Sequence, residues 1–230
     1  MAKFHFVEDY ERFVASLIKA HPIDKAMSLA VGGSYHEIGK IEAEIVEWAR
    51  LKEGMSIFDL GCGSGRLAYA LSKRMNKLEF TGTDVVQSLL DYAHSKTPAS
   101  YRYLRHPACS VPMAKESVDF CTSFSVFTHL LHSESYIYLE DMFRVLKPGG
   151  SVVMSFLEFF KPSHWTPFEN EVAARRKGTG SPLNTLIERS VIDVWAAHLG
   201  YDKPVFIDGD AAPWGTSALG QSIAILRKRN

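Results

Sequence analysis

A glycine-rich turn at residues 58–66 constrains the fold of this chain more than any other segment. It reads Phe58-Asp59-Leu60-Gly61-Cys62-Gly63-Ser64-Gly65-Arg66 and completes a short apolar run, Met55–Leu60. Glycine lets the backbone turn sharply and approach a ligand without a Cβ in the way. The pattern predicts a buried strand, a tight turn and then a helix, whose first N–H groups favour anions or lone pairs.

An acid follows at the end of the next apolar segment, because Asp84 lies 23 residues after Gly61. A carboxylate at that point can accept hydrogen bonds from both ribose hydroxyls of a nucleoside. A dinucleotide fingerprint needs a third glycine at position 66, where this chain has Arg66. The loop therefore departs from the dinucleotide type.

Strand and helix patterns alternate from residue 55 onward. The segments with strand character are Met55–Leu60, Leu78–Thr83, Tyr101–Leu104, Val118–Phe124, Ser151–Phe156, Pro204–Ile207 and Gln221–Arg227. Helical patterns lie between them, at Gln87–Lys96 and at Ser133–Leu146, the second of which is expected to stop at Lys147-Pro148-Gly149-Gly150. This alternation implies right-handed crossovers. We expect an α/β, Rossmann-like, seven-stranded, mostly parallel sheet with helices on both faces and the last strand antiparallel.

The chain shows no repeat or long linker, so we expect a single domain over residues 1–230. Residues 1–50 have helical periodicity and are expected to form a helical cover. Within it, Ser34 of the glycine joint is expected to cap the following helix. Residues 51–157 are then the cofactor-binding core, and residues 158–230 are the substrate cap and C-terminal strands.

Charge and composition exclude several classes of protein. Lys plus Arg and Asp plus Glu each number 26, so there is no basic excess to favour a nucleic-acid partner. No apolar run approaches the ~18 residues of a membrane span, and the first residues lack the apolar core of a signal peptide. The three cysteines share no metal-ligand spacing. We expect a cytoplasmic enzyme without a metal.

The run Gly61-x-Gly63-x-Gly65, preceded by Asp59, resembles the first motif of class I S-adenosylmethionine-dependent methyltransferases. The resemblance covers roughly residues 55–157 by order and spacing. It implies S-adenosylmethionine as cofactor and S-adenosylhomocysteine as product, with Asp59 near the amino group and Asp84 at the ribose. The cofactor-binding residues expected on this basis are Tyr35, Asp59, Gly61, Cys62, Gly63, Gly65, Asp84, Val85, Ala108, Cys109, Ser123, Phe124 and Ser125.

Two of these expectations have particular reasons. Pro107 stands where the family often has the acid that reaches the adenine amine, so only the backbone of Ala108 and Cys109 is expected to line the ring. A simple loop explains Cys109 equally well. Tyr35 is expected to close over the cofactor from the N-terminal side.

The segment from Ser123 to Leu130 resembles the corresponding part of small-molecule methyltransferases. It lacks the Asn/Asp-Pro-Pro-aromatic signature of enzymes that methylate base amines, and no paired-glutamate segment of the protein-arginine type is present. The tail Gly220–Arg227 resembles those of methyltransferases of polysaccharide or cell-envelope biosynthesis. These resemblances imply a small-molecule or saccharide acceptor, with oxygen favoured over nitrogen.

An alcohol acceptor needs a general base, for which histidine is well suited. His129 follows the fourth strand and is the first candidate, before His132 and His36. A histidine at a strand end equally serves as a cap or backbone clamp. The aromatic segment 156–168 is too irregular for an amphipathic helix and is expected to be a substrate cap or a loop over the sheet edge; its candidates for contact with the acceptor are Glu158, His164 and Trp165.

Two other classes of function stay open. One is an NAD(P)-dependent oxidoreductase, which Arg66 in the fingerprint opposes; Tyr69 and Lys73 have the spacing of a reductase pair but belong to the first helix after the loop. The other is a non-catalytic cofactor-binding or partner module, which only the intact glycine loop and Asp84 oppose.

Overall fold

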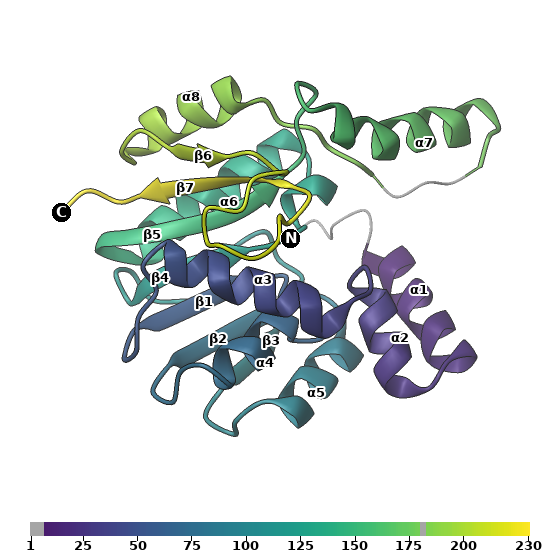
Figure 1. Ribbon diagram of the computed structural model, residues 1–230, viewed down its shortest axis with the longest axis horizontal. Helices are drawn as coiled ribbons and strands as arrows, with labels where there is room; N and C mark the ends of the chain where they lie inside the picture. The colour runs from purple at the N-terminus through teal and green to yellow at the C-terminus, as the bar shows by residue number, and fades with distance from the viewer. Residues whose placement is uncertain (1–6, 180–182) are drawn as a thin grey trace. The chain divides into compact units, whose positions relative to one another are not determined.

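The computed structural model describes residues 7–179 and 183–230 (Figure 1). Predictions that touch residues 1–6 and 180–182, at the start of the cover and within the cap region, lie outside the described residues. The described residues form two compact units, which divide between Pro112 and Met113. The single domain over residues 1–230 stays a prediction.

The first unit holds a three-stranded parallel sheet with helices. Its elements are α1 (Val7–Ala20), α2 (Ile23–Ala30), α3 (Tyr35–Trp48), β1 (Ser56–Leu60), α4 (Arg66–Ser72), β2 (Glu79–Asp84), α5 (Gln87–Lys96) and β3 (Arg102–Arg105). The strands run in the order β3-β2-β1, and both pairings are parallel, with Asp59 beside Gly82 and Asp84 beside Arg105. The carboxyl ends of all three strands therefore meet at one edge, where ligands bind in open α/β sheets.

The helical cover packs on this edge of the first unit. Val14 of α1 and Met27 of α2 form a buried apolar cluster with Val86 and Leu89, which follow β2. Helix α3 lies so close to α4 that a Cβ at Gly39 would come 2.5 Å from the carbonyl oxygen of Arg66. The cover thus belongs to the same packed body as the glycine loop.

The second unit holds four strands. Its elements are β4 (Val118–Ser123), η1 (Phe127–His129), α6 (His132–Val145), β5 (Leu146–Phe156), η2 (Pro162–His164), α7 (Trp165–Arg176), α8 (Arg189–Leu199), β6 (Val205–Ile207) and β7 (Ser222–Arg227). Strand β4 pairs parallel with β5, while β7 pairs antiparallel with both β5 and β6. The predicted antiparallel pair at the end of the chain is confirmed.

One local prediction, the Ser34 cap, is wrong, and the bounds of two elements differ from those expected. Lys147–Gly150 ends helix α6 as expected, but it continues as strand β5 through a register shift against β4, with Gly149 at a φ of 77°. Ser34 occupies the N-cap position of α3 without a side-chain capping bond, because its own backbone is left-handed. The aromatic segment 156–168 is not an amphipathic helix, as expected, but its last residues begin helix α7 at Trp165, since Pro167 falls in the first turn, where a missing N–H costs nothing.

Candidate active site

The glycine loop connects β1 to α4 through three left-handed residues. The φ angles of Gly61, Gly63 and Gly65 are 67°, 53° and 80°. Side chains with a Cβ rarely adopt such angles, so the loop requires glycine at all three positions. Gly65 is the N-cap residue of α4, which aims the free N–H groups of the helix at the ligand edge of the sheet.

The acid at the end of β2 is bonded directly to this loop. Asp84 Oδ2 accepts a hydrogen bond of 3.0 Å from the Gly63 N–H, and Oδ1 accepts one of 2.9 Å from the Val86 N–H. Burial raises the pKa of Asp84 to about 6, although the backbone donors oppose the shift. Each carboxylate oxygen keeps a further lone pair, so the group can still accept two ribose hydroxyls.

The helical cover fixes the tip of the loop. The Ser64 hydroxyl donates to the Met27 carbonyl at 3.0 Å, and the Tyr35 hydroxyl donates to the Ser64 carbonyl at 3.1 Å. Tyr35 is buried. In the structure Tyr35 holds the loop in place from α3, and its closure over the cofactor stays a prediction.

A buried ion pair, which sequence reasoning missed, fixes the other side of the loop. Arg66 donates from Nε to Glu42 Oε1 at 2.8 Å, and it also donates to the Val31 carbonyl. Glu42 is 1% exposed. The position of Arg66 after the third glycine is visible in the sequence, but nothing in the sequence pairs it with Glu42, 24 residues away.

The remaining candidates of the first unit surround the same edge. Asp59 is buried on β1, and burial, with the nearby charges of Asp59 and Asp84, raises the pKa of the buried Cys62 thiol. The half-buried Val85, Ala108 and Cys109 follow the ends of β2 and β3. His36 packs against two aromatic side chains, with its ring centroid 5.2 Å from those of Tyr35 and Tyr69.

These residues fit a nucleoside cofactor that carries an amino-acid chain. The loop is closely packed at two of its glycines, because a Cβ at Gly63 would lie 2.6 Å from Val31 Cγ1 and a Cβ at Gly65 would lie 2.6 Å from Ala93 Cβ. A buried carboxylate suited to ribose is bonded directly to this loop. Asp59 supplies a second buried carboxyl group on the adjacent strand.

In the second unit, the end of β4 brings together three predicted residues. Ser123 and Phe124 are buried, and Ser123 Oγ has no hydrogen-bond partner within the described chain. Ser125 has a φ of 60°, which is unusual for a residue other than glycine. Strain of this kind persists only where the surroundings enforce it, and it gathers at functional sites.

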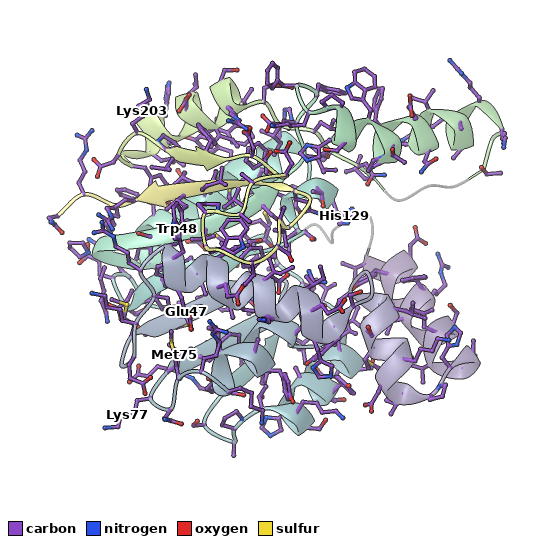
Figure 2. All side chains as sticks on the ribbon, viewed as in Figure 1. Glu47, Trp48, Met75, Lys77, His129 and Lys203 are labelled. Atoms are coloured by element: carbon purple, nitrogen blue, oxygen red, sulfur yellow. The ribbon has the colours of Figure 1, made fainter. Side chains whose placement is uncertain are left out.

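His129 ends the short helix η1 that follows this turn (Figure 2). Its Nδ1 lies 2.8 Å from the Leu183 carbonyl oxygen. A carbonyl only accepts hydrogen bonds, so Nδ1 carries the proton, and in the neutral ring Nε2 holds the lone pair. His132 Nε2 lies 3.3 Å from the Leu186 carbonyl oxygen, so this nitrogen donates its proton to the same segment of chain that binds His129.

The predicted substrate-binding residues that follow β5 are hydrogen-bonded to other residues of the second unit. Glu158 is 1% exposed and receives two hydrogen bonds from Arg189, at 2.8 and 2.9 Å. His164 accepts from the Glu158 N–H through Nδ1 and contacts the Gly220 carbonyl through Nε2. Both side chains are thus hydrogen-bonded within the second unit, and their contact with the acceptor stays a prediction. Trp165 is 42% exposed, with its indole N–H bonded to the Phe159 carbonyl.

Two classes of site are absent from the described part of the chain. Residues 7–179 and 183–230 contain no cluster of three His, Cys, Asp or Glu side chains arranged to hold a metal ion. Within the same ranges, every helix is too short or too polar to cross a bilayer.

Comparisons with known proteins agree with this geometry. A family model described as a methyltransferase domain matches residues 58–154, and a model of protein-L-isoaspartate(D-aspartate) O-methyltransferases matches residues 6–100. A glycine loop bonded to an acid at the end of the next strand is the arrangement at which α/β folds bind nucleotides. Residues 58–154 therefore carry a methyltransferase domain, and solved structures that share the fold include S-adenosylmethionine-dependent methyltransferases.

A curated relative and two solved structures illustrate the similarity. Demethylmenaquinone methyltransferase of Staphylococcus aureus (strain MRSA252) is 33% identical over 107 residues, 45% of this chain and 43% of the relative. An S-adenosylmethionine-dependent methyltransferase of Thermotoga maritima has a TM-score of 0.67 at 16% identity, covering 98% of this chain and 100% of that one. Magnesium protoporphyrin IX methyltransferase of Synechocystis PCC 6803, with bound S-adenosylhomocysteine, has a TM-score of 0.61 at 14% identity, covering 88% and 86%.

These similarities confirm the predicted fold class. The chain has the Rossmann-like, seven-stranded, mostly parallel architecture with its last strand antiparallel. The first curated relatives are matched over less than half of their own length.

Proposed function

We propose that this protein transfers the methyl group of S-adenosylmethionine to an oxygen of a small molecule or saccharide, with nitrogen as the less favoured acceptor atom. The glycine loop bonded to Asp84 supports the cofactor half of this proposal. The neutral formal charge supports a small acceptor over a nucleic acid. The observation that carries the preference for oxygen is the orientation of His129 by the Leu183 carbonyl.

The bound cofactor supplies an electrophilic methyl group for in-line displacement by a lone pair. On the side of the protein, the Asp84 carboxylate accepts the ribose hydroxyls, and the loop N–H groups take the polar end of the cofactor. His129 accepts the proton of the acceptor hydroxyl at Nε2, since its Nδ1 proton is held by Leu183. A neutral imidazole suits this task near pH 7.

The other two histidines support the fold. His132 binds the Leu186 carbonyl and meets Trp195 edge-on, with ring centroids 5.6 Å apart. His36 packs against Tyr35 and Tyr69 in the first unit. We therefore place the general base at His129.

Transfer of labelled methyl groups from S-adenosylmethionine tests the proposal. The acceptors are methyl α-D-glucopyranoside, catechol and 1,4-naphthohydroquinone for oxygen, histamine for nitrogen and bulk tRNA as a macromolecular control. His129→Ala should lower kcat by ~10²–10⁴, with S-adenosylhomocysteine affinity unchanged. His132→Ala is the matched control and should lose activity only with its folded fraction. Labelling of histamine alone would contradict the preference for oxygen, and labelling of tRNA alone would contradict a small acceptor.

A cytoplasmic location completes the proposal. None of the three cysteines, all within the described chain, forms a disulfide, as is usual in a reducing compartment. Fractionation of cells that express the protein, with immunodetection in each fraction, tests this location.

A further inference from the structure

Three strand ends of the second unit meet through side-chain hydrogen bonds. Ser125 follows β4, Ser155 is the penultimate residue of β5, and Gln221 immediately precedes β7. Because β7 runs antiparallel to β5, its first residues lie at the same edge as the carboxyl end of β5, with Ser222 paired to Phe156. Gln221 therefore stands at the edge of the sheet where ligands bind in folds of this kind.

The hydrogen bonds between these residues fix the left-handed turn at Ser125. The Ser125 N–H donates to Ser155 Oγ at 2.7 Å, and the Ser155 hydroxyl donates to Gln221 Oε1, also at 2.7 Å. The Ser125 hydroxyl donates to the same amide oxygen at 3.3 Å. The Thr128 hydroxyl donates to the Ser125 carbonyl at 3.1 Å, which ties η1 to the turn.

The arrangement orients the Gln221 amide in one direction. Its oxygen takes hydrogen bonds from Ser155, which is fully buried, and from Ser125, which is half-buried. The amide nitrogen is on the opposite side of the planar carboxamide and carries two N–H donors. No residue in the described ranges accepts a hydrogen bond from it, and the side chain is only half-buried. Such a group is a preorganised donor for a ligand oxygen.

We propose that Gln221 binds the methyl acceptor, with its carboxamide nitrogen donating hydrogen bonds to an acceptor oxygen while Ser155 and Ser125 hold the amide in position. This inference rests on the proposed function, since it concerns the acceptor of the same reaction. It names oxygen-bearing acceptors as the preferred class: a hydroxyl, carbonyl or carboxylate oxygen adjoining the methylated atom can accept these bonds, and an ammonium group cannot.

Replacement of the amide by a carboxylate of the same shape isolates the donor. Gln221→Glu keeps an oxygen for Ser155 and Ser125 but places a second oxygen where the amide nitrogen was. We expect the KM for each oxygen acceptor that the wild type methylates to rise at least tenfold, because the oxygen of the acceptor now faces an acceptor group. The dissociation constant of S-adenosylhomocysteine should stay within twofold. Gln87→Glu, in α5, makes the same chemical change at the other glutamine of the chain and should alter neither value.

A second variant tests whether Gln221 acts only by holding the turn at Ser125 in place. Ser125→Gly accepts the left-handed turn without strain, so the fold of the turn no longer depends on Gln221. In this background Gln221→Glu should still raise the acceptor KM, because the donor is lost while the turn remains. If the effect disappears in the Ser125→Gly background, Gln221 is only a brace for the turn and the proposal is overturned.

The outcomes separate this inference from the proposed function. An unchanged KM in Gln221→Glu, with normal wild-type turnover of methyl α-D-glucopyranoside, catechol or 1,4-naphthohydroquinone, would overturn the role of Gln221 alone. Binding of S-adenosylhomocysteine by a wild type that methylates none of these three acceptors would overturn both this role and the acceptor class. Failure of the wild type to bind S-adenosylhomocysteine would overturn the cofactor assignment itself.

Discussion

The N–H of Gly63 donates a 3.0 Å hydrogen bond to the carboxylate of Asp84, so the turn after β1 and the acid at the end of β2 form one unit. The bond ties the geometry of the cofactor loop to the ionisation of a single buried group. A change in either residue should therefore affect cofactor binding and stability together.

Cofactor affinity should depend on the protonation of Asp84. The pKa of this group is about 6 because of burial, so the carboxylate is largely protonated at pH 5 and then loses acceptor capacity toward ribose hydroxyls. We expect S-adenosylhomocysteine to bind about tenfold more weakly at pH 5 than at pH 7. Calorimetric titration across this range measures the effect. The Asp84→Asn variant should bind weakly at both values, and a pH-independent affinity in the wild type would contradict the role of the carboxylate.

The same group should make the ligand-free protein less stable as the pH rises. The pKa of Asp84 is raised from 3.8 to about 6, so the folded state holds a proton that the unfolded state releases between those values. The free energy of unfolding of the wild type, relative to Asp84→Asn, should fall by about 2 kcal/mol between pH 4.5 and 7.5. Urea unfolding of both proteins at several pH values provides the measurement. If the free energies of unfolding of the wild type and Asp84→Asn changed with pH in parallel, burial would not destabilise the Asp84 carboxylate, and the prediction would be contradicted.

Gly63→Ala should lower the stability of the protein and its cofactor affinity more than Gly54→Ala does. Both glycines have positive φ, of 53° and 82°, but only Gly63 has a neighbour, Val31 Cγ1 at 2.6 Å from the added Cβ. Gly54→Ala should cost about 1 kcal/mol of stability through its conformation alone. Gly63→Ala should cost more and weaken S-adenosylhomocysteine binding at least tenfold. Trimming Val31→Ala should restore part of the stability of Gly63→Ala; equal effects at Gly63 and Gly54 would rule out the contact.

The buried ion pair behind the loop should be costly to break from one side. Arg66→Met leaves Glu42 buried without its partner, which should cost about 3–5 kcal/mol. The loss should shrink at lower pH, because burial raises the pKa of Glu42 and protonation removes the charge. Arg229→Met breaks the exposed pair with Asp202 and is the control, with an expected loss of no more than about 1 kcal/mol. Thermal and urea unfolding measure the loss of stability in both variants. Similar losses would show that Glu42 is well hydrated and would contradict the prediction.

The sequence predicts most strands well because they are short, largely buried runs between glycine, proline or polar residues, whereas β3, with Arg102 and Arg105, is mostly exposed. The glycine loop and Asp84 are predictable for a related reason, since spacing along a strand-turn-helix unit fixes where they meet. Tyr35, Arg66 and Gln221 are different. Tyr35 is bonded to Ser64, 29 residues away, and Arg66 to Glu42, 24 residues away. Gln221 is bonded to Ser155, 66 residues away. These roles depend on packing that no local pattern encodes.

The element bounds at Lys147–Gly150 and Trp165 differ from the expected ones for a common physical reason. Glycine and proline are strong signals for the end of an element, but a bulge and the first turn of a helix both tolerate them. The partners of Glu158 and His164 were equally hidden, because Arg189 and Gly220 lie 31 and 56 residues further along the chain.

Calorimetric titration of the wild type and Asp84→Ala with S-adenosylhomocysteine and with NADH tests the central claim most directly. The account predicts that the wild type binds S-adenosylhomocysteine and not NADH, and that Asp84→Ala loses most of this affinity. Removal of two charge-assisted hydrogen bonds, each worth roughly 1.5–3 kcal/mol, accounts for the loss. Binding of NADH with equal affinity, or S-adenosylhomocysteine binding that survives in Asp84→Ala, would contradict the account.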